Sequence, residues 1–127
     1  MERAIEIMAC VQFAVIGFSH LIQPRAWVTL FITLREKGHS GVFLNAFLSL
    51  WFGGLVVAFH NVWTGLPAIL TVIGWAQLIK AAVSFIAPAV GLRGMQRVAL
   101  DRAWEFQAAG GIFIVLSVLL GYALLRA

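Results

Sequence analysis

The feature that most constrains this chain is an uncharged run of 42 residues, 38–79, which contains no Lys, Arg, Asp or Glu. A transmembrane helix needs about 20 apolar residues to cross about 30 Å of hydrocarbon, so the run is too long for one crossing and long enough for two. Asn61 and Gly65, near its middle, tolerate the backbone angles of a chain reversal. Pro67 suits the first turn of a following helix. The run therefore predicts two membrane-spanning helices joined by a tight turn.

Four segments in all are long and apolar enough to cross a bilayer. The chain is 62% hydrophobic and 11% charged, with a mean hydropathy of +0.98, whereas soluble domains average about a quarter charged residues. The spans and their connections occupy nearly the whole sequence. This predicts one membrane domain, 1–127, with an all-α fold in which four transmembrane helices form a bundle. The predicted spans are 5–22, 42–59, 66–87 and 106–125.

A short amphipathic helix is predicted directly after the first span. Beyond Pro24, apolar residues recur at spacings of three and four, from Trp27 to Leu34, which gives a helix one apolar face. A helix of this kind lies in the membrane interface, and we place it at 25–37. Tryptophan prefers the same depth, so Trp27, Trp63 and Trp104 are predicted interface anchors.

The connection before the last span carries charges at helical spacing. Arg97, Asp101 and Glu105 follow one another at intervals of four. This spacing predicts either a second surface helix or an extension of the last span, with an ion pair between Arg97 and Asp101.

The basic residues predict an orientation. Cytoplasmic loops of membrane proteins collect Lys and Arg, and six such residues fall in the first and third connections against two on the other side. We therefore predict a multi-pass protein of the bacterial inner membrane with both termini periplasmic. Because the bases flank membrane spans, we predict no nucleic-acid partner. The six are Arg25, Arg35, Lys37, Arg93, Arg97 and Arg102, and the two are Arg3 and Arg126.

Polar residues within the spans fall on one face of each helix. Polar side chains are costly in lipid unless they face protein or water, so these faces either pack against each other through hydrogen bonds or line a polar cavity or pore. Both alternatives stay open. The candidate ligand-binding or pore-lining residues are Gln12, Ser19, His20, Asn45, Ser49, His60, Gln77, Lys80, Ser84, Glu105 and Ser117.

Lys80 is the most informative of these residues. It lies about seven residues, or about 10 Å, from the cytoplasmic end of its predicted span. Its long stem either lifts the ammonium group towards the interface or the charge lies inside the bundle, where Glu105 is the nearest candidate counter-ion. Glu6 lies near the opposite membrane face.

The histidines raise the question of haem or a metal. Bis-histidine haem requires two imidazoles at one depth on facing helices, whereas His20 and His60 end their spans on opposite sides. We therefore predict no cofactor and no metal. The sequence contains no motif that pairs a nucleophile with a base, which favours a non-enzymatic protein.

Two short patterns recur along the chain. A serine followed by a helix-ending proline and an arginine occurs in 19–25 and again in 84–93, and a pair of glycines occurs at 53–54 and 110–111. The sequence leaves open whether these matches reflect an internal duplication or coincidence.

The segment 60–88 resembles a pattern in small bacterial integral membrane proteins of uncharacterised function. In those, an Asn-x-Trp turn precedes a span with Ile-Gly-Trp, an intramembrane Lys and a terminating Pro. The whole arrangement of a first span, an interfacial helix and three further spans is similar to the DoxX-like four-helix proteins. The matching residues here are Asn61, Trp63, Ile73, Gly74, Trp75, Lys80 and Pro88.

These observations predict a non-enzymatic membrane protein that binds a small apolar ligand or serves as an accessory or scaffold subunit. We expect it to contact the lipid bilayer and to form a homo-oligomer or part of a membrane complex. A small channel or transporter that uses the polar faces is the alternative, and a redox or haem-binding membrane subunit is the third.

Overall fold

The computed structural model describes residues 1–126 and is all-α. Four helical stretches are long and apolar enough to span a membrane, and a short helix follows the first of them. The prediction of fold class is therefore confirmed, and the helices begin and end within about three residues of the predicted spans. The elements are α1 (Glu2–Ile22), α2 (Pro24–Glu36), α3 (His39–Phe59), α4 (Ala68–Ile86), α5 (Pro88–Met95), a 3₁₀ turn η1 (Leu100–Arg102) and α6 (Trp104–Arg126).

The outer surface of the helices is apolar. Leu48, Trp51, Ile79, Ile86 and Val118 are each more than half exposed. A chain in water would leave little such surface uncovered, whereas a bilayer solvates it and the helices satisfy their own backbone hydrogen bonds. The protein is therefore a multi-pass membrane protein in contact with lipid.

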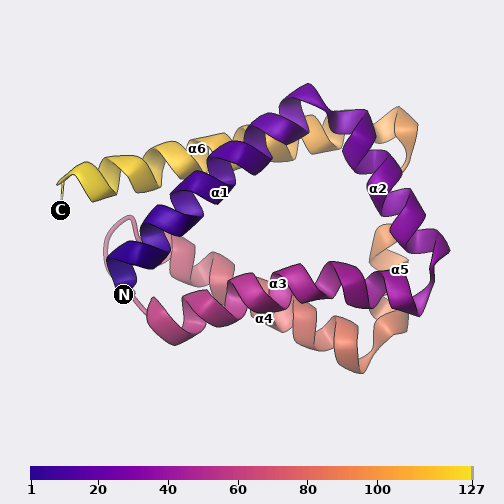
Figure 1. Ribbon diagram of the computed structural model, residues 1–127, viewed down its shortest axis with the longest axis horizontal. Coiled ribbons are helices and arrows are strands. Elements are labelled where there is room, and N and C mark those ends of the chain that lie inside the picture. The colour runs from indigo at the N-terminus through magenta and orange to yellow at the C-terminus, as the bar shows by residue number, and fades with distance from the viewer. Residues whose placement is uncertain (127) are drawn as a thin grey trace.

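The spans form two antiparallel pairs, α1 with α6 and α3 with α4 (Figure 1). Each pair packs through glycine. A Cβ added to Gly110 would lie 2.6 Å from the carbonyl oxygen of Gly17, and one added to Gly53 would lie 2.7 Å from that of Gly74. In lipid, where apolar side chains gain nothing by leaving solvent, such close backbone contact is a principal source of helix association.

The chain turns sharply wherever a span meets a proline. The residue before a proline is displaced from helical angles by the ring, and Gln23 (φ −125°, ψ 52°) and Ala87 (φ −130°, ψ 73°) both show this. Pro24 and Pro88 then begin α2 and α5, where no amide hydrogen is required. Both short helices therefore lead away from the axes of the spans that precede them.

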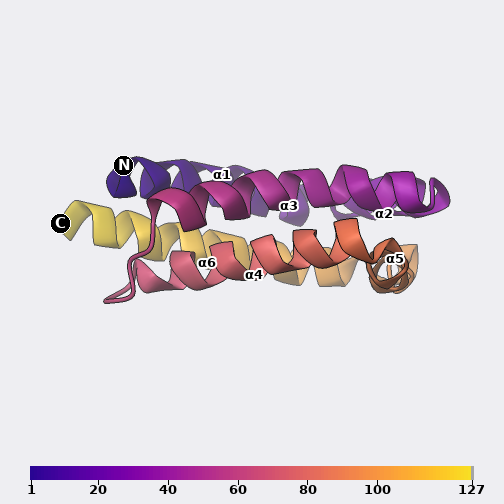
Figure 2. The same ribbon diagram turned by 90° about the horizontal axis from the view of Figure 1, so that it is seen from below.

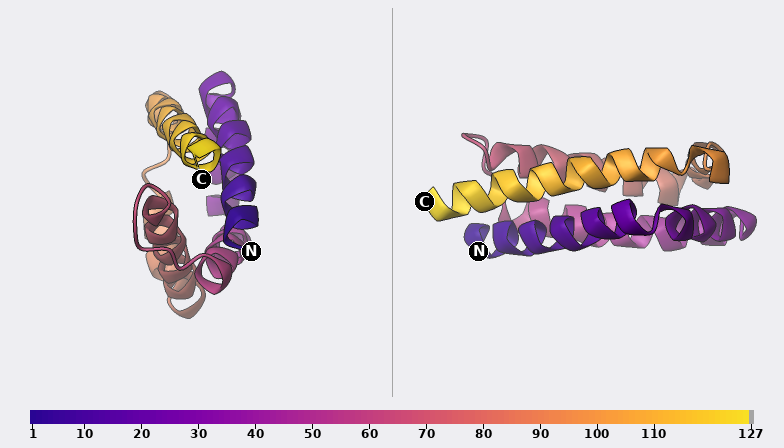
Figure 3. Two further views of the ribbon diagram at one scale, coloured as in Figure 1. Left: turned by 90° about the vertical axis from the view of Figure 1, so that its left-hand side faces the viewer. Right: turned by 90° about the horizontal axis from the view of Figure 1, so that it is seen from above.

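The two halves of the chain lie in two layers. In Figure 2, α1, α2 and α3 form one layer and α4, α5 and α6 form the other. The end view of Figure 3 shows the α1/α6 pair above the α3/α4 pair. Each half thus contributes a span, a short helix after a proline and a second span. Each pair consists of one span from the first half and one from the second. An internal duplication, which the sequence left open, would produce this arrangement.

The two pairs meet at one end of the molecule and diverge at the other (Figure 1). We call the end with the first turn of α1, the last turn of α6 and the α3–α4 loop the terminal end, and the end with α2 and α5 the connector end. The core lies towards the terminal end, whereas at the connector end α2 bridges the gap between the pairs. The buried core consists of Ile5, Ala9, Phe13, Val56, Leu70 and Leu120.

The connection before α6 contains elements of both sequence predictions. It begins with the short helix α5, which ends at Met95, and the turn η1 directly before Trp104 extends the last helical stretch back to Leu100. The predicted pair between Arg97 and Asp101 is therefore wrong, since their four-residue spacing is not helical here. Arg97 instead contacts Glu105, with 2.7 Å between Nη2 and Oε1.

We predict that Gly53→Ala and Gly110→Ala each lower the free energy of unfolding by about 1–3 kcal/mol, because the new methyl groups would push paired backbones apart. The matched controls are Gly54→Ala and Gly111→Ala, since nothing lies within 4 Å of a Cβ at either position. These should be neutral or stabilise by up to about 1 kcal/mol through helix propensity. Unfolding in mixed SDS micelles, followed by circular dichroism, measures all four; equal losses at positions 53 and 54 would contradict the proposed packing.

Candidate functional site

A cavity with a volume of about 440 Å³ lies at the connector end. Its wall is formed by α2, α3, α4, α5, the segment after α5 and the start of α6. Most of the lining is apolar, with Phe31 and Phe106 among its largest side chains. Three polar side chains also line it: Asn45 from α3, and Lys80 and Ser84 from α4. This cavity is the size of a small-molecule site.

Lys80 lines this cavity without a counter-ion. It lies six residues before the end of α4 at Ile86, about 9 Å along the helix axis. No hydrogen bond or ion pair joins it to any residue in 1–126. The expected partner, Glu105, is engaged by Arg97, and this contact raises the pKa of the Arg97 guanidinium through the hydrogen bond first and charge attraction second. Glu105 as a counter-ion for Lys80 is therefore wrong.

A second cavity, of about 240 Å³, lies between the two helix pairs at mid-depth. Gln12 of α1, Ser49 of α3 and Gln77 of α4 line it together with three phenylalanines, including Phe13 and Phe52. These polar residues come from three helices and were each predicted as candidates. The structure therefore places these three predicted residues around one cavity.

His20 borders a third cavity, of about 340 Å³, with Phe106 and Glu105. Its ring stacks on Trp27, with 4.2 Å between ring centroids, and on Phe106. Nδ1 lies 2.8 Å from the carbonyl oxygen of Ile16, which can only accept, so Nδ1 carries the hydrogen and Nε2 has a free lone pair in the neutral ring. Trp27 in turn donates to Ser19 Oγ at 2.8 Å, which fixes the indole against the histidine.

The three cavities share walls at the connector end and the middle of the molecule. The first and third share Phe31, Gly94, Val98 and Phe106, and the second and third share Phe113. Towards the terminal end, a separate cavity between α1, α4 and α6 has a volume of only about 10 Å³ and is lined mostly by leucines. The three larger cavities therefore lie in the middle of the molecule and towards α2 and α5.

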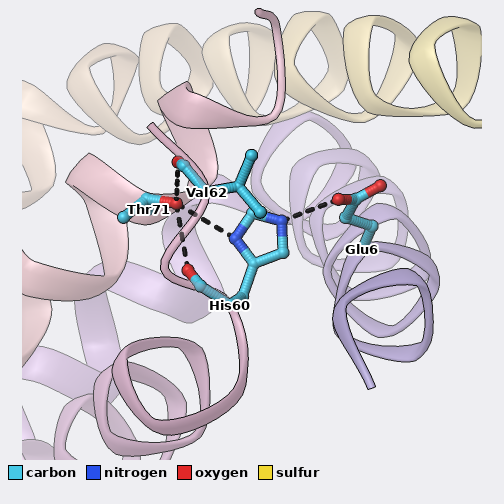
Figure 4. Close-up of polar contacts among 4 residues, drawn as sticks. All are labelled: Glu6, His60, Val62 and Thr71. Atoms are coloured by element: carbon cyan, nitrogen blue, oxygen red, sulfur yellow. Dashed lines mark hydrogen bonds and ion pairs between the residues drawn. The ribbon is translucent and has the colours of Figure 1, made fainter. Parts of the chain in front are cut away.

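A buried polar cluster closes the terminal end (Figure 4). It consists of Glu6 of α1, His60 at the end of α3, Thr71 of α4 and the carbonyl oxygen of Val62. Oε2 of Glu6 lies 2.7 Å from Nε2 of His60, and Thr71 Oγ1 lies 3.1 Å from Nδ1 of the same ring. Thr71 Oγ1 also contacts the carbonyl oxygens of His60 at 3.0 Å and Val62 at 2.6 Å. His60 and Thr71 have no exposed surface.

Asn61 of the Asn-x-Trp turn and Trp75 of the Ile-Gly-Trp span bind each other beside the loop that carries His60. Trp75 Nε1 donates to Asn61 Oδ1 at 3.1 Å, and the Asn61 amide donates to the carbonyl oxygen of Val57. Gly65 takes the positive φ of 70° that the reversal requires. Asn61 and Trp75 therefore have a structural role, since their hydrogen bond joins the loop after α3 to α4.

Sequence reasoning missed the partnership of Glu6 with His60. Both residues were placed near the same membrane face, and that shared depth was the available signal; what the sequence lacked was the contact of α1 with the α3–α4 loop. The remaining predicted residues are dispersed. Ser117 Oγ donates to the Cys10 carbonyl oxygen at 2.8 Å, and Trp63 and Trp104 are exposed.

The two histidines of the predicted spans lie at opposite ends of the molecule. His20 lies at the connector end and His60 at the terminal end, where its two ring nitrogens are engaged by Glu6 and Thr71. Within residues 1–126, no three His, Cys, Asp or Glu side chains gather as metal ligands would.

Comparison with known proteins gives no match to a family model, to a curated protein or to a solved structure. The architecture is that of a small four-span membrane protein, and membership of the DoxX-like family stays a prediction. The site must therefore be interpreted from its own chemistry.

Proposed function

We propose that this membrane protein is a non-enzymatic binder of one small amphiphilic ligand, whose apolar body occupies the connector-end cavity and whose acidic group pairs with Lys80. The observation that carries the proposal is an ammonium group without a counter-ion in a cavity of about 440 Å³ with a mostly apolar wall. An unpaired charge at membrane depth is costly, and an anionic ligand group would remove that cost.

The polar neighbours of Lys80 support this assignment. Asn45 and Ser84 line the same cavity and can donate hydrogen bonds to a carboxylate. The rest of the lining suits a hydrocarbon body, and the walls formed by α2 and α5 lie where a molecule could enter from the membrane interface. The bound molecule is therefore expected to carry one acidic group on an apolar chain.

A small transporter is the second candidate. It is supported by the shared walls of the three cavities and by the gathering of Gln12, Ser49 and Gln77 between the pairs. The terminal end, where the packed core and the Glu6–His60–Thr71 cluster lie between the pairs, favours a binder over an open channel.

We expect decanoate, used as the probe, to bind wild-type protein in mild detergent and Lys80→Gln to weaken it at least about tenfold, which is the loss of one charge-assisted contact. Decanol, which has the same chain without the charge, should bind both proteins alike. Native mass spectrometry counts the bound molecules and also gives the mass of the homo-oligomer that we expect.

The matched control for this experiment is Lys37→Gln, because Lys37 is an exposed lysine at the end of α2 outside the cavity. It should leave decanoate binding unchanged. Equal weakening by both variants, or equal binding of decanoate and decanol to the wild type, would contradict the role of Lys80.

We also propose that the protein resides in a bacterial inner membrane with its connector end in the cytoplasm. The six basic residues of the first and third connections all belong to the segments that follow α1 and α4 at this end, and cytoplasmic loops favour such residues. Both ends of the chain would then be periplasmic.

In a Cys10→Ser background, we expect Thr64→Cys to react with an impermeant maleimide in intact cells and Gln96→Cys to react only after the cells are opened. Both positions are exposed, so accessibility differs only through the membrane side. The reverse pattern of labelling would refute this orientation.

A further inference from the structure

The contact between Glu6 and His60 joins the two helix pairs. Glu6 belongs to α1, whereas His60 caps α3 and reaches Thr71 of α4. Among the described residues it is the one side-chain hydrogen bond that runs directly between the α1/α6 pair and the α3/α4 pair. The other bonds at this end remain within a pair, such as the donation from Arg3 to the Leu124 carbonyl oxygen at 3.5 Å. The protonation of Glu6 and His60 therefore affects the contact between the two helix pairs.

The hydrogen atoms in the cluster can be counted from its geometry. Thr71 Oγ1 has one hydrogen, and it faces two carbonyl oxygens, of Val62 at 2.6 Å and of His60 at 3.0 Å, which only accept. The contact between Oγ1 and Nδ1 at 3.1 Å then needs the hydrogen of the ring, so Nδ1 of His60 donates. The 2.7 Å contact between Nε2 and Glu6 also contains one hydrogen. That hydrogen belongs either to an imidazolium facing a carboxylate or to a carboxylic acid facing a neutral imidazole.

We propose that Glu6 and His60 form a buried proton-binding site, in which one shared proton holds the terminal ends of the two helix pairs together. Removal of this proton would set a carboxylate against the lone pair of Nε2, which repel each other. Addition of a second proton would leave a buried imidazolium beside a neutral acid, with no compensating charge. The Glu6–His60 pair therefore joins the terminal ends of the two helix pairs in its singly protonated state.

Protons reach this site through Glu6. The side chain of His60 has no exposed surface, whereas that of Glu6 is 13% exposed. A proton from outside therefore binds a Glu6 oxygen before it passes to Nε2. The hydroxyl of Thr71 keeps Nδ1 protonated, so exchange is confined to the Nε2 side of the ring.

No other charged group within residues 1–126 forms an ion pair with this site. On α1, Glu2 and Arg3 are exposed, and Arg3 points to the end of α6. On α6, Arg126 donates to the Tyr122 hydroxyl at 2.7 Å. The helices α3 and α4 contribute no charge near the site, since the run 38–79 has none and Lys80 lies towards the other end of α4. The proton is thus held by the Glu6–His60 pair alone.

The test is a pH titration of the full chain in lipid, labelled with ¹⁵N-histidine and ¹³C-glutamate and observed by NMR. We expect the Glu6 carboxyl carbon and the His60 Nε2 signal to change at one common midpoint, while Nδ1 stays protonated throughout. His20 and His39 serve as internal references. Separate midpoints for Glu6 and His60, or loss of the hydrogen from Nδ1, would overturn the proposal.

Two variants with matched controls sharpen the test. Glu6→Gln should abolish the common transition, because its amide can donate to Nε2 and has no proton to release, whereas Glu2→Gln should leave the transition intact. Should Glu6→Gln not fold, Thr71→Val provides the second test. It removes the acceptor for Nδ1 and should let both tautomers of His60 appear, and Thr71→Ser should preserve the wild-type spectrum. A Thr71→Val spectrum identical to that of the wild type would also overturn the proposal.

Discussion

The close backbone contact within each helix pair is the constraint on which the rest of the structure depends. In lipid, no hydrophobic driving force brings apolar helices together, so their association depends on tight packing and on hydrogen bonds. Gly17 against Gly110, towards the connector end, and Gly53 against Gly74, towards the terminal end, provide that packing. In each pair, every helix packs one face against the other helix. A second face contacts lipid, and a third faces the opposite pair.

The two helix pairs contact each other differently at the two ends of the molecule. At the terminal end, Phe13, Val56 and Leu70 form a packed core, and every polar group of the Glu6–His60–Thr71 cluster has a partner. At the connector end, the pairs diverge, and α2 and α5 surround a cavity with the unpaired Lys80 in its wall. Satisfied polar groups rigidify a structure, whereas the charge of Lys80 has no partner beside the cavity. The terminal end is thus closed by packing and hydrogen bonds, and the connector end contains the cavity where we propose that a ligand binds.

Much of the fold could be predicted from the sequence, because hydropathy and proline report local structure directly. The uncharged run 38–79 gave two spans and their turn, and the pattern after Pro24 gave α2. Helix pairing could not be predicted, since four apolar helices have no sequence signal for partner choice. For the same reason the contact of Glu6 with His60 was missed, and Arg97 was assigned to Asp101 on a helical spacing that the irregular chain does not adopt. The candidate residues Gln12, Ser49 and Gln77 do gather in one cavity, but only the structure places Lys80 away from Glu105.

The central claim is that the helix pairs are joined at the terminal end and diverge at the connector end. Distances between spin labels on α1 and α4 in lipid nanodiscs measure this most directly, because both helices run from the terminal to the connector end. One double variant places labels at positions 4 and 69, and a second at positions 22 and 86, all exposed and in a Cys10→Ser background. A clearly longer distance for 22 and 86 than for 4 and 69 is the predicted result. Equal distances would mean that the axes of the two helix pairs stay equally far apart along the molecule, and would contradict the account.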